Sequence, residues 1–213
     1  MALVQGRPFL EHILDYWIEQ GLSEFVLSVG FMAEAISEHF GNEYHGARIL
    51  YSEESSPLGT GGGLAAALSK FPTESPFLVL NGDTFFKVSL GELTDSVRES
   101  SAAWTLALFH TSDSARYGAL TLGPRDRILS IGTHQRAEPF WANGGVWAAN
   151  PGVAGLRFPE SSGPYSLEAY LEGFIASSRF NVFGLRSEGT FIDIGLPGDY
   201  MRAQAMEEFG SSL

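Results

Sequence analysis

Two aspartates at the ends of apolar runs are the residues best suited to do chemistry in this sequence. Asp83 follows the run Phe77 to Leu80 in Leu-Asn-Gly-Asp-Thr, and Asp193 is embedded in Thr-Phe-Ile-Asp-Ile-Gly. Mg²⁺ typically takes one or two carboxylates plus substrate oxygens, so the pair predicts a shared cation. Each residue also has an ordinary alternative, since Asn81-Gly82 is a common hairpin turn and Asp193 could bond to local backbone.

A glycine-rich run, Pro57-Leu58-Gly59-Thr60-Gly61-Gly62-Gly63, is the second candidate. Glycines let a backbone approach a ligand and aim its N–H groups at it, and the N-terminus of a following helix favours anions. A flexible surface loop is the alternative, but the position between a strand and a helix favours a ligand. The run lacks the Gly-Lys-Ser/Thr that would make it a P-loop.

A third group of polar and glycine residues lies in the second half of the chain. It comprises Tyr117-Gly118, Asn143-Gly144-Gly145 and Glu168. Each has a structural interpretation when taken singly: Asn-Gly-Gly in a strand is typical of a bulge, and Glu168 follows a Ser166 N-cap as a favourable charge at a helix start.

Strands and helices must position these residues, and the two alternate along the first half of the chain. Such alternation is typical of a doubly wound α/β fold. Helices are predicted at about 9–18, 32–40, 89–99, 166–177 and 197–209, and a further helix starts in the glycine run. Strands are predicted at about 25–29, 47–52, 77–80, 104–109, 117–122, 127–132, 142–148 and 190–195. Ligands of such folds gather at the carboxyl ends of the strands, where the candidate residues lie.

The expected fold is therefore a Rossmann-like, doubly wound mixed sheet with antiparallel additions in the C-terminal half. We expect one domain over residues 1–213 with one continuous sheet, divided into two halves at about residue 110. A doubly wound fold usually begins with a strand, whereas this sequence begins with a helix, so the first strand is expected to be missing. The apolar sheet edge left by that strand would favour a homo-oligomer.

Composition excludes several classes of protein. The 213 residues carry a formal net charge of −12 and no cysteine, which argues against nucleic acid or an anionic membrane as a partner and removes disulfides and thiolate ligands. No stretch of 18 uncharged apolar residues and no signal peptide is visible, so a cytoplasmic location is expected. The histidines show no paired metal spacing, and no nucleophile elbow is present.

The order of these pieces resembles that of the sugar-1-phosphate nucleotidyltransferases, and most of all the heptose and mannose 1-phosphate guanylyltransferases among them. The matching stretches are GRPFLEHILDYW, FVLSVGF, PLGTGGG, FLVLNGDTFF, ARYGAL, NGG and FIDIGLPGDYMRA. The resemblance implies transfer of a guanylyl group from GTP to a sugar 1-phosphate, with release of pyrophosphate.

The resemblance also implies a role for each candidate residue. Asp83 and Asp193 would be catalytic and would hold Mg²⁺. The resemblance would also make about 1–110 the nucleotide-binding half and about 111–213 the sugar-binding half, and it assigns the remaining residues to one substrate or the other. The nucleotide would contact Leu58, Gly59, Thr60, Gly61, Gly62, Asn81 and Gly82, and the sugar phosphate would contact Tyr117, Gly118, Asn143, Gly144 and Glu168.

Two departures from the family pattern lower the expected activity. The family's Gly-Gly-x-Gly-Thr-Arg-Leu loop and a following lysine have no counterpart before MALVQGRPFLEH, and the family's Glu-Lys-Pro is replaced near Ser130 to Gln135, where His134 or Arg136 could substitute. Electrostatic groups of this kind are commonly worth about 10²–10³ in rate each, so weak or no transferase activity is expected. A non-catalytic binding paralogue and a metal-dependent glycosyltransferase are the alternatives.

Overall fold

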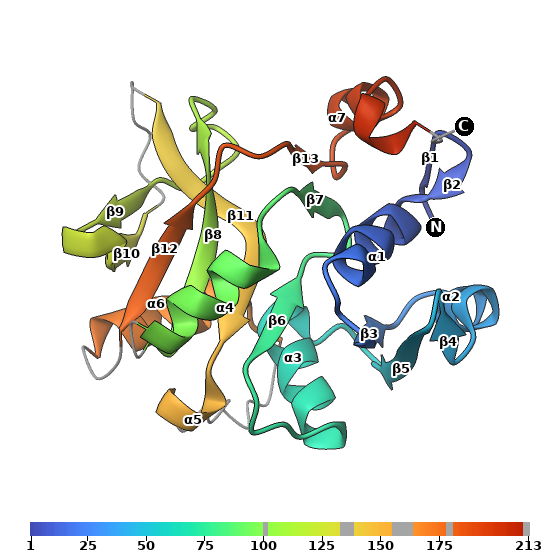
Figure 1. The fold of residues 1–213 in the computed structure, drawn as a ribbon, viewed down its shortest axis with the longest axis horizontal. Helices are drawn as coiled ribbons and strands as arrows, with labels where there is room; N and C mark the ends of the chain where they lie inside the picture. Colours follow the sequence, from blue (N-terminus) through green and yellow to red (C-terminus); the bar gives the residue numbers. More distant parts are fainter. Residues whose placement is uncertain (100–101, 133–138, 155–163, 178–180, 211–213) are drawn as a thin grey trace.

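A computed structural model describes residues 1–99, 102–132, 139–154, 164–177 and 181–210, and its mixed α/β architecture confirms the expected fold class. Figure 1 shows the arrangement of its elements. The helices are α1 (Phe9–Glu19), α2 (Ala33–Phe40), α3 (Gly59–Lys70), α4 (Leu90–Glu99), α5 (Pro151–Ala154), α6 (Leu167–Ala176), α7 (Pro197–Ala203) and the 3-10 turns η1 (Pro124–Asp126) and η2 (Glu207–Phe209). The strands are β1 (Leu3–Val4), β2 (Arg7–Pro8), β3 (Glu24–Val29), β4 (Glu43–Tyr44), β5 (Ala47–Glu53), β6 (Phe77–Leu80), β7 (Thr84–Phe86), β8 (Trp104–Thr111), β9 (Leu120–Leu122), β10 (Ile128–Ile131), β11 (Phe140–Ala149), β12 (Val182–Arg186) and β13 (Phe191–Asp193).

The larger sheet has four strands in the order β12-β8-β11-β6. β12 runs parallel to β8, and β11 runs antiparallel to both of its neighbours. The register of β11 against β8 shifts between Asn143 and Trp147, which makes the Asn-Gly-Gly segment the bulge that its glycines predicted as one alternative.

The smaller sheet has three strands in the order β3-β5-β4, with β3 parallel to β5. The expectation of one continuous sheet is therefore wrong for the described residues. β3 ends one sheet and β6 ends the other, because no described strand pairs with the second edge of either. Figure 1 shows β6 and β3 next to each other between α1 and α3.

Several short elements were not predicted because two- to five-residue strands carry too little pattern. β12 and β7 are examples. The strand expected at about 190–195 is present as β13, but its pairing with β7, which places Thr84 opposite Asp193, was not predicted. The expected helix at 197–209 ends at Ala203, and a 3-10 turn follows it. The expected strand at 117–122 begins at Leu120.

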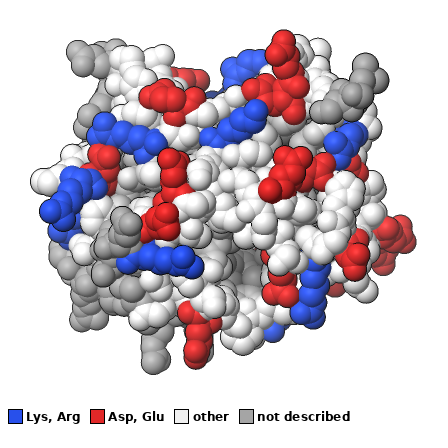
Figure 2. Space-filling view, viewed as in Figure 1, with Lys and Arg blue, Asp and Glu red and all other residues white. Residues whose placement is uncertain are grey.

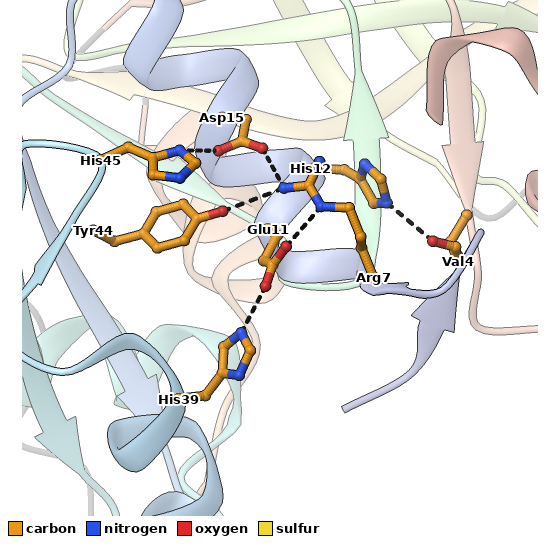
Figure 3. Close-up of polar contacts among 8 residues, drawn as sticks. All are labelled: Val4, Arg7, Glu11, His12, Asp15, His39, Tyr44 and His45. Carbon is orange, nitrogen blue, oxygen red and sulfur yellow. Dashed lines mark hydrogen bonds and ion pairs between the residues drawn. The ribbon is translucent and has the colours of Figure 1, made fainter. Parts of the chain in front are cut away.

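A cluster of ion pairs joins α1 to the α2 and β4 region (Figure 3). Arg7 Nε and Nη2 donate to Glu11 Oε2 at 2.8 Å and to Asp15 Oδ2 at 2.6 Å. The same carboxylates contact the rings of His39, 2.6 Å from Glu11, and His45, 2.9 Å from Asp15. Exposed pairs of this kind contribute about 0–1 kcal/mol each, so the cluster orients α1 more than it stabilises the fold.

Two hydrophobic clusters form the core. One surrounds α1 and includes Phe9, Trp17, Phe85 and Phe209, and the other surrounds β8 and is centred on Trp104 and its neighbours. In the part of the chain that the structure describes, the helices are too short or too polar to cross a membrane.

Candidate active site

The structure brings Asp83 and Asp193 together around Gly195. Pairing of β7 with β13 sets the register, and the Ile194 N–H donates to the Asp83 carbonyl oxygen at 2.9 Å. A Cβ placed on Gly195 would lie 3.0 Å from Asp193 Oδ1 and 3.9 Å from Asp83 Oδ2. One oxygen of each carboxylate therefore borders the same small space, although the two aspartates are far apart in sequence.

Arg116 balances part of the negative charge at this point. Its Nη2 lies 3.1 Å from Asp193 Oδ2 and donates to the Asp193 carbonyl at 3.2 Å, and its Nη1 pairs with Asp199. The guanidinium also lies 5.0 Å from the centre of the Tyr117 ring. Arg116 was not predicted as a site residue, although it lies in the matching stretch ARYGAL. A basic side chain next to Tyr117 in so acidic a chain was the available signal.

The two aspartates fit a divalent cation that is completed by a substrate. They supply the carboxylate oxygens that Mg²⁺ prefers, and the remaining ligands would come from water and phosphate. Within the described ranges, no group of three or more His, Cys, Asp or Glu side chains could hold a metal ion. The donor set thus suits Mg²⁺ with a phosphate ligand better than a site closed by protein side chains.

Contacts within the protein account for several glycines of the glycine-rich run. A Cβ on Gly61 would overlap the Tyr165 ring, and one on Gly63 would lie 2.5 Å from Glu54 Oε1. Gly59 has φ of +73° and packs against the Tyr165 carbonyl. These positions need glycine for packing, whether or not a ligand binds.

The glycine-rich run also holds the start of α6. Thr60 Oγ1 accepts a hydrogen bond from the Leu167 N–H at 2.8 Å, and the Tyr165 carbonyl accepts one from the Gly61 N–H at 3.0 Å. Glu54 Oε2 accepts from the Leu58 N–H at 3.0 Å. Sequence reasoning missed Glu54 and Tyr165; the acidic pair before the run was a signal for the first, and nothing local pointed to the second.

A cavity of about 1370 Å³ contains part of the predicted nucleotide set. Gly59, Thr60, Asn81, Gly82 and Asp83 line it, whereas Leu58, Gly61 and Gly62 do not. The cavity continues between β3 and β6, beyond the residues predicted from the sequence.

A chain of hydrogen bonds connects the predicted sugar residues to the predicted nucleotide residues. Asn143 Nδ2 donates to Glu168 Oε1 at 3.4 Å, and Asn143 Oδ1 accepts from the Gly145 N–H at 3.1 Å. The Gly145 carbonyl in turn accepts from the Asn81 N–H at 2.9 Å. The expected Ser166 N-cap is present and accepts from the Ala169 N–H.

Tyr117 lines a second cavity, of about 510 Å³, together with Arg116, Asp199 and Arg202. Burial raises the pKa of Tyr117 to about 12, so its hydroxyl stays protonated at neutral pH. Asn143, Gly144 and Glu168 line neither cavity.

The remaining predicted sugar residues are held by protein contacts. Gly118 lies against the Gly132 carbonyl, and a Cβ on Gly144 would lie 2.5 Å from the Phe86 ring. His134 and Arg136 lie outside the described residues. The face shown in Figure 2 carries acidic and basic side chains interspersed with uncharged ones.

Comparisons with known proteins show the family of this chain. Residues 1–208 match the family described as Nucleotidyl transferase. The D-glycero-alpha-D-manno-heptose 1-phosphate guanylyltransferase of Aneurinibacillus thermoaerophilus is 38% identical over 209 residues, which cover 96% of this chain and 86% of the relative. The protein of the same name from Campylobacter jejuni is 34% identical over 202 residues, covering 94% and 86%.

Solved structures share the fold. HddC from Yersinia pseudotuberculosis, in a crystal structure described as complexed with GMP-PN, superposes with a TM-score of 0.80 at 24% identity and covers 96% of this chain and 88% of that one. A putative glucose-1-phosphate thymidylyltransferase from Bacillus anthracis gives a TM-score of 0.81 at 14% identity, covering 98% and 86%.

Proposed function

The chain belongs to the nucleotidyl transferase family and is a sugar-1-phosphate nucleotidyltransferase by descent, and from this premise we propose that it transfers a guanylyl group from GTP to heptose or mannose 1-phosphate. The products would be a GDP-sugar and pyrophosphate. The choice of guanine and of a heptose rests on the names of two relatives at 38% and 34% identity, and the choice of mannose rests on the name of a mannose-1-phosphate guanylyltransferase from Mycobacterium tuberculosis at 26% identity.

The convergence of Asp83 and Asp193 at Gly195 is the observation that supports this proposal. Asp83 and Ile194 line the cavity that also contains Gly59 and Thr60. Arg116 then links Asp193 to Tyr117 on the other side. A nucleotide on the first side and a sugar phosphate on the second would therefore meet at the two carboxylates.

The remaining site residues take their proposed roles from this geometry. Gly59, Thr60, Asn81 and Gly82 line the nucleotide cavity, while Leu58, Gly61 and Gly62 shape the loop beneath it. On the sugar side, Tyr117 offers a protonated hydroxyl. Gly118, Asn143, Gly144 and Glu168 would support and orient the sugar pocket.

Transfer between two phosphates needs in-line positioning and charge neutralisation more than a covalent nucleophile. Members of the family generally use a divalent metal, and we propose Mg²⁺ here, which when bound would polarise the phosphate oxygens. Asp83 and Asp193 would orient the phosphates through their oxygens, and Arg116 would keep Asp193 in place.

Titration calorimetry with GTP in the presence and absence of Mg²⁺ tests the assignment of the carboxylates. Asp83→Asn and Asp193→Asn keep the side-chain volume and remove a charge, so we expect each to weaken Mg²⁺-dependent GTP binding by about tenfold or more. Asp95→Asn on the exposed side of α4 is the matched control and should bind as the parent does.

A product assay separates the reaction from binding. Mannose or heptose 1-phosphate is mixed with GTP or UTP and Mg²⁺, and GDP-sugar, UDP-sugar and pyrophosphate are measured. Preference for GTP supports the guanylyl assignment, and equal use of UTP contradicts it without affecting the carboxylates. Unchanged Mg²⁺-dependent binding in both aspartate variants would show the metal assignment to be wrong.

The proposal includes a division of labour and a location. The half at about 1–110 would bind the nucleotide and the half at about 111–213 the sugar. A cytoplasmic location would suit a cysteine-free protein that uses nucleoside triphosphates.

A further inference from the structure

The turn between β3 and α2 presents two apolar side chains to solvent. Phe31 is 93% exposed, the highest value among the large apolar side chains that the structure describes, and the neighbouring Met32 is 57% exposed. A phenylalanine ring left in water gives folding none of the stabilisation that its burial would provide. We call residues 30–32 the Phe31 turn.

Backbone strain is located at the same turn. Met32 has φ of 60° and ψ of 33°, a left-handed conformation in which the Cβ of an L-residue lies too close to the following carbonyl oxygen. At the start of α2 the Ala33 N–H donates to the Gly30 carbonyl oxygen at 3.1 Å, which closes the turn. Strain that the surrounding structure holds in place is typical of ligand contacts.

The Phe31 turn lies against the start of the glycine-rich run. The Glu54 N–H donates to the Val29 carbonyl oxygen at 2.8 Å, and a Cβ on Gly30 would lie 3.7 Å from the Glu54 carbonyl oxygen. The side chain of Glu54 in turn accepts from the Leu58 N–H. Since consecutive Cα atoms are about 3.8 Å apart, Phe31 begins within one residue of this contact.

A nucleotide in the proposed cavity would pass over the carboxyl end of β3. The cavity is lined by Gly59 and Thr60, which come after β5, and by Asp83, which comes after β6. β3 pairs with β5 and lies next to β6 (Figure 1), and its last residue, Val29, lines the same cavity. With the phosphates at Asp83, the base would lie at the opposite end, beside the Phe31 turn.

We propose that Phe31 stacks on the base of the bound nucleotide and favours a purine, an inference that rests on the proposed function. Backbone groups of the glycine-rich run can bond to the edge of a base, but they do not cover its face. An aromatic ring covers that face, and the two rings of a purine offer it more area than the single ring of a pyrimidine. An exposed ring gives up few packing contacts when it turns onto a base, so the stacking requires no rearrangement of the core.

A tryptophan in place of Phe31 reports the stacking directly. Of the four native tryptophans, Trp17, Trp104 and Trp147 are buried, so the indole added in Phe31→Trp gives most of the emission that a solute can quench. GTP with Mg²⁺ should quench this emission, whereas inorganic triphosphate, which lacks the base, should not. Leu129→Trp is the matched control, since Leu129 is 49% exposed in β10 and lines neither cavity, and its emission should not respond to GTP.

Calorimetry with Mg²⁺ measures the contribution of the ring to affinity. Phe31→Ala should weaken GTP binding by roughly tenfold, UTP binding by about threefold or less, and the binding of inorganic triphosphate not at all. Phe31→Tyr keeps an aromatic ring and should bind GTP as the parent does. Because the side chain at this position is exposed, the thermal unfolding of each variant should match that of the parent.

Several results would overturn the inference. Absence of quenching by both GTP and UTP in Phe31→Trp, or GTP binding to Phe31→Ala at the parent affinity, would exclude the stacking. Equal losses for GTP and inorganic triphosphate would assign the effect to the phosphates, and equal losses for GTP and UTP would contradict the preference for a purine. Emission of Phe31→Trp that changes with protein concentration alone would identify the Phe31 turn as a contact between copies of the chain.

Failure of the proposed function has a different signature. It is shown by Asp83→Asn and Asp193→Asn that leave Mg²⁺-dependent GTP binding unchanged, whereas the Phe31 variants leave both carboxylates in place. Loss of the stacking alone would therefore leave the assignment of the two aspartates standing.

Discussion

β8 and β6 belong to the same sheet and are both mostly apolar, yet one is closed on all sides and the other is open. All residues from Trp104 to Phe109 of β8 are buried, since β12 and β11 flank them and helices cover the faces. None of the four residues Phe77–Leu80 of β6 reaches the same burial. The difference is one neighbouring strand, because β8 has two partners and β6 has one.

The comparison shows that an apolar run predicts a strand but does not determine how deeply that strand is buried. We call the part around β8 the closed region and the part around the facing edges of β3 and β6 the open region. Tyr117 and Arg116 lie near the carboxyl end of β8 in the closed region, while Asp83 follows β6 in the open region. The open region therefore lines the same cavity as the proposed nucleotide residues.

Truncation of one leucine in each region should give the largest difference in stability. Leu106→Ala in β8 removes a fully buried side chain and should lower the free energy of unfolding by about 3 kcal/mol. Leu78→Ala in β6 removes a half-buried side chain and should cost about 1 kcal/mol. Urea denaturation measures both, and equal losses would show that the two strands are equally buried in solution.

Arg116 should matter for stability because it pairs with two carboxylates while only 18% of its side chain is exposed. Arg116→Gln leaves Asp193 and Asp199 beside each other without a shared cation, and we expect a loss of about 2 kcal/mol in urea denaturation at pH 7. Arg202→Gln is the control, since Arg202 pairs with the same Asp199 but is 60% exposed, and it should cost less than about 0.5 kcal/mol. Similar losses in the free energy of unfolding of both variants would show that the burial of Arg116 does not strengthen its ion pairs.

Substitution of glycine by alanine should have opposite effects on stability at a tightly packed glycine and at an exposed one, both close to the contact between the two regions. Gly61→Ala drives a Cβ into the Tyr165 ring between α3 and α6 and should cost about 1.5 kcal/mol. Gly173→Ala in the interior of α6 meets no atom within 4 Å and should stabilise the protein by about 0.5 kcal/mol through its helix propensity. The midpoint of thermal unfolding should therefore shift in opposite directions in the two variants. An unchanged midpoint in Gly61→Ala would show that the start of α3 moves enough to accommodate the methyl group.

The sequence predicted the long elements well because each carries several turns or alternations of pattern. The helix at 9–18 and the strand at 104–109 lie within one or two residues of their expected bounds. It did not predict that the sheet is split, because an apolar run indicates a strand without showing which edges of that strand are paired.

Only part of the candidate site could be predicted, because some of its contacts join segments that are far apart in the sequence. Asp83 and Asp193 could be identified as carboxylates at strand ends, and the structure brings them together through the β7–β13 ladder. The partner of the glycine-rich run could not be predicted, since Tyr165 is about one hundred residues away and its contact arises only when α6 packs on α3. Glycines that were predicted to contact a ligand therefore contact a side chain of the same chain.

The smallest expected effect concerns the C-terminal turn, which packs on the α1 face of the open region through Phe209. Donation of the Thr190 hydroxyl to Glu208 Oε1 at 2.6 Å lowers the pKa of that carboxyl. Thr190→Val removes the hydrogen bond and should lower the free energy of unfolding by about 0.5–1 kcal/mol at pH 7.

Because the folded pKa of Glu208 is the lower one, its stabilising contribution is complete above the unfolded pKa of about 4.3 and disappears as the pH falls through the folded pKa. The difference between the parent and Thr190→Val in urea denaturation should stay constant from about pH 7 to pH 5 and narrow below pH 4. Glu208→Gln, which keeps an acceptor but cannot ionise, should show no such narrowing against its own Thr190→Val double variant. A difference between parent and Thr190→Val that is independent of pH would assign the stabilisation to packing of the turn on α1 and not to the ionised Glu208 carboxylate.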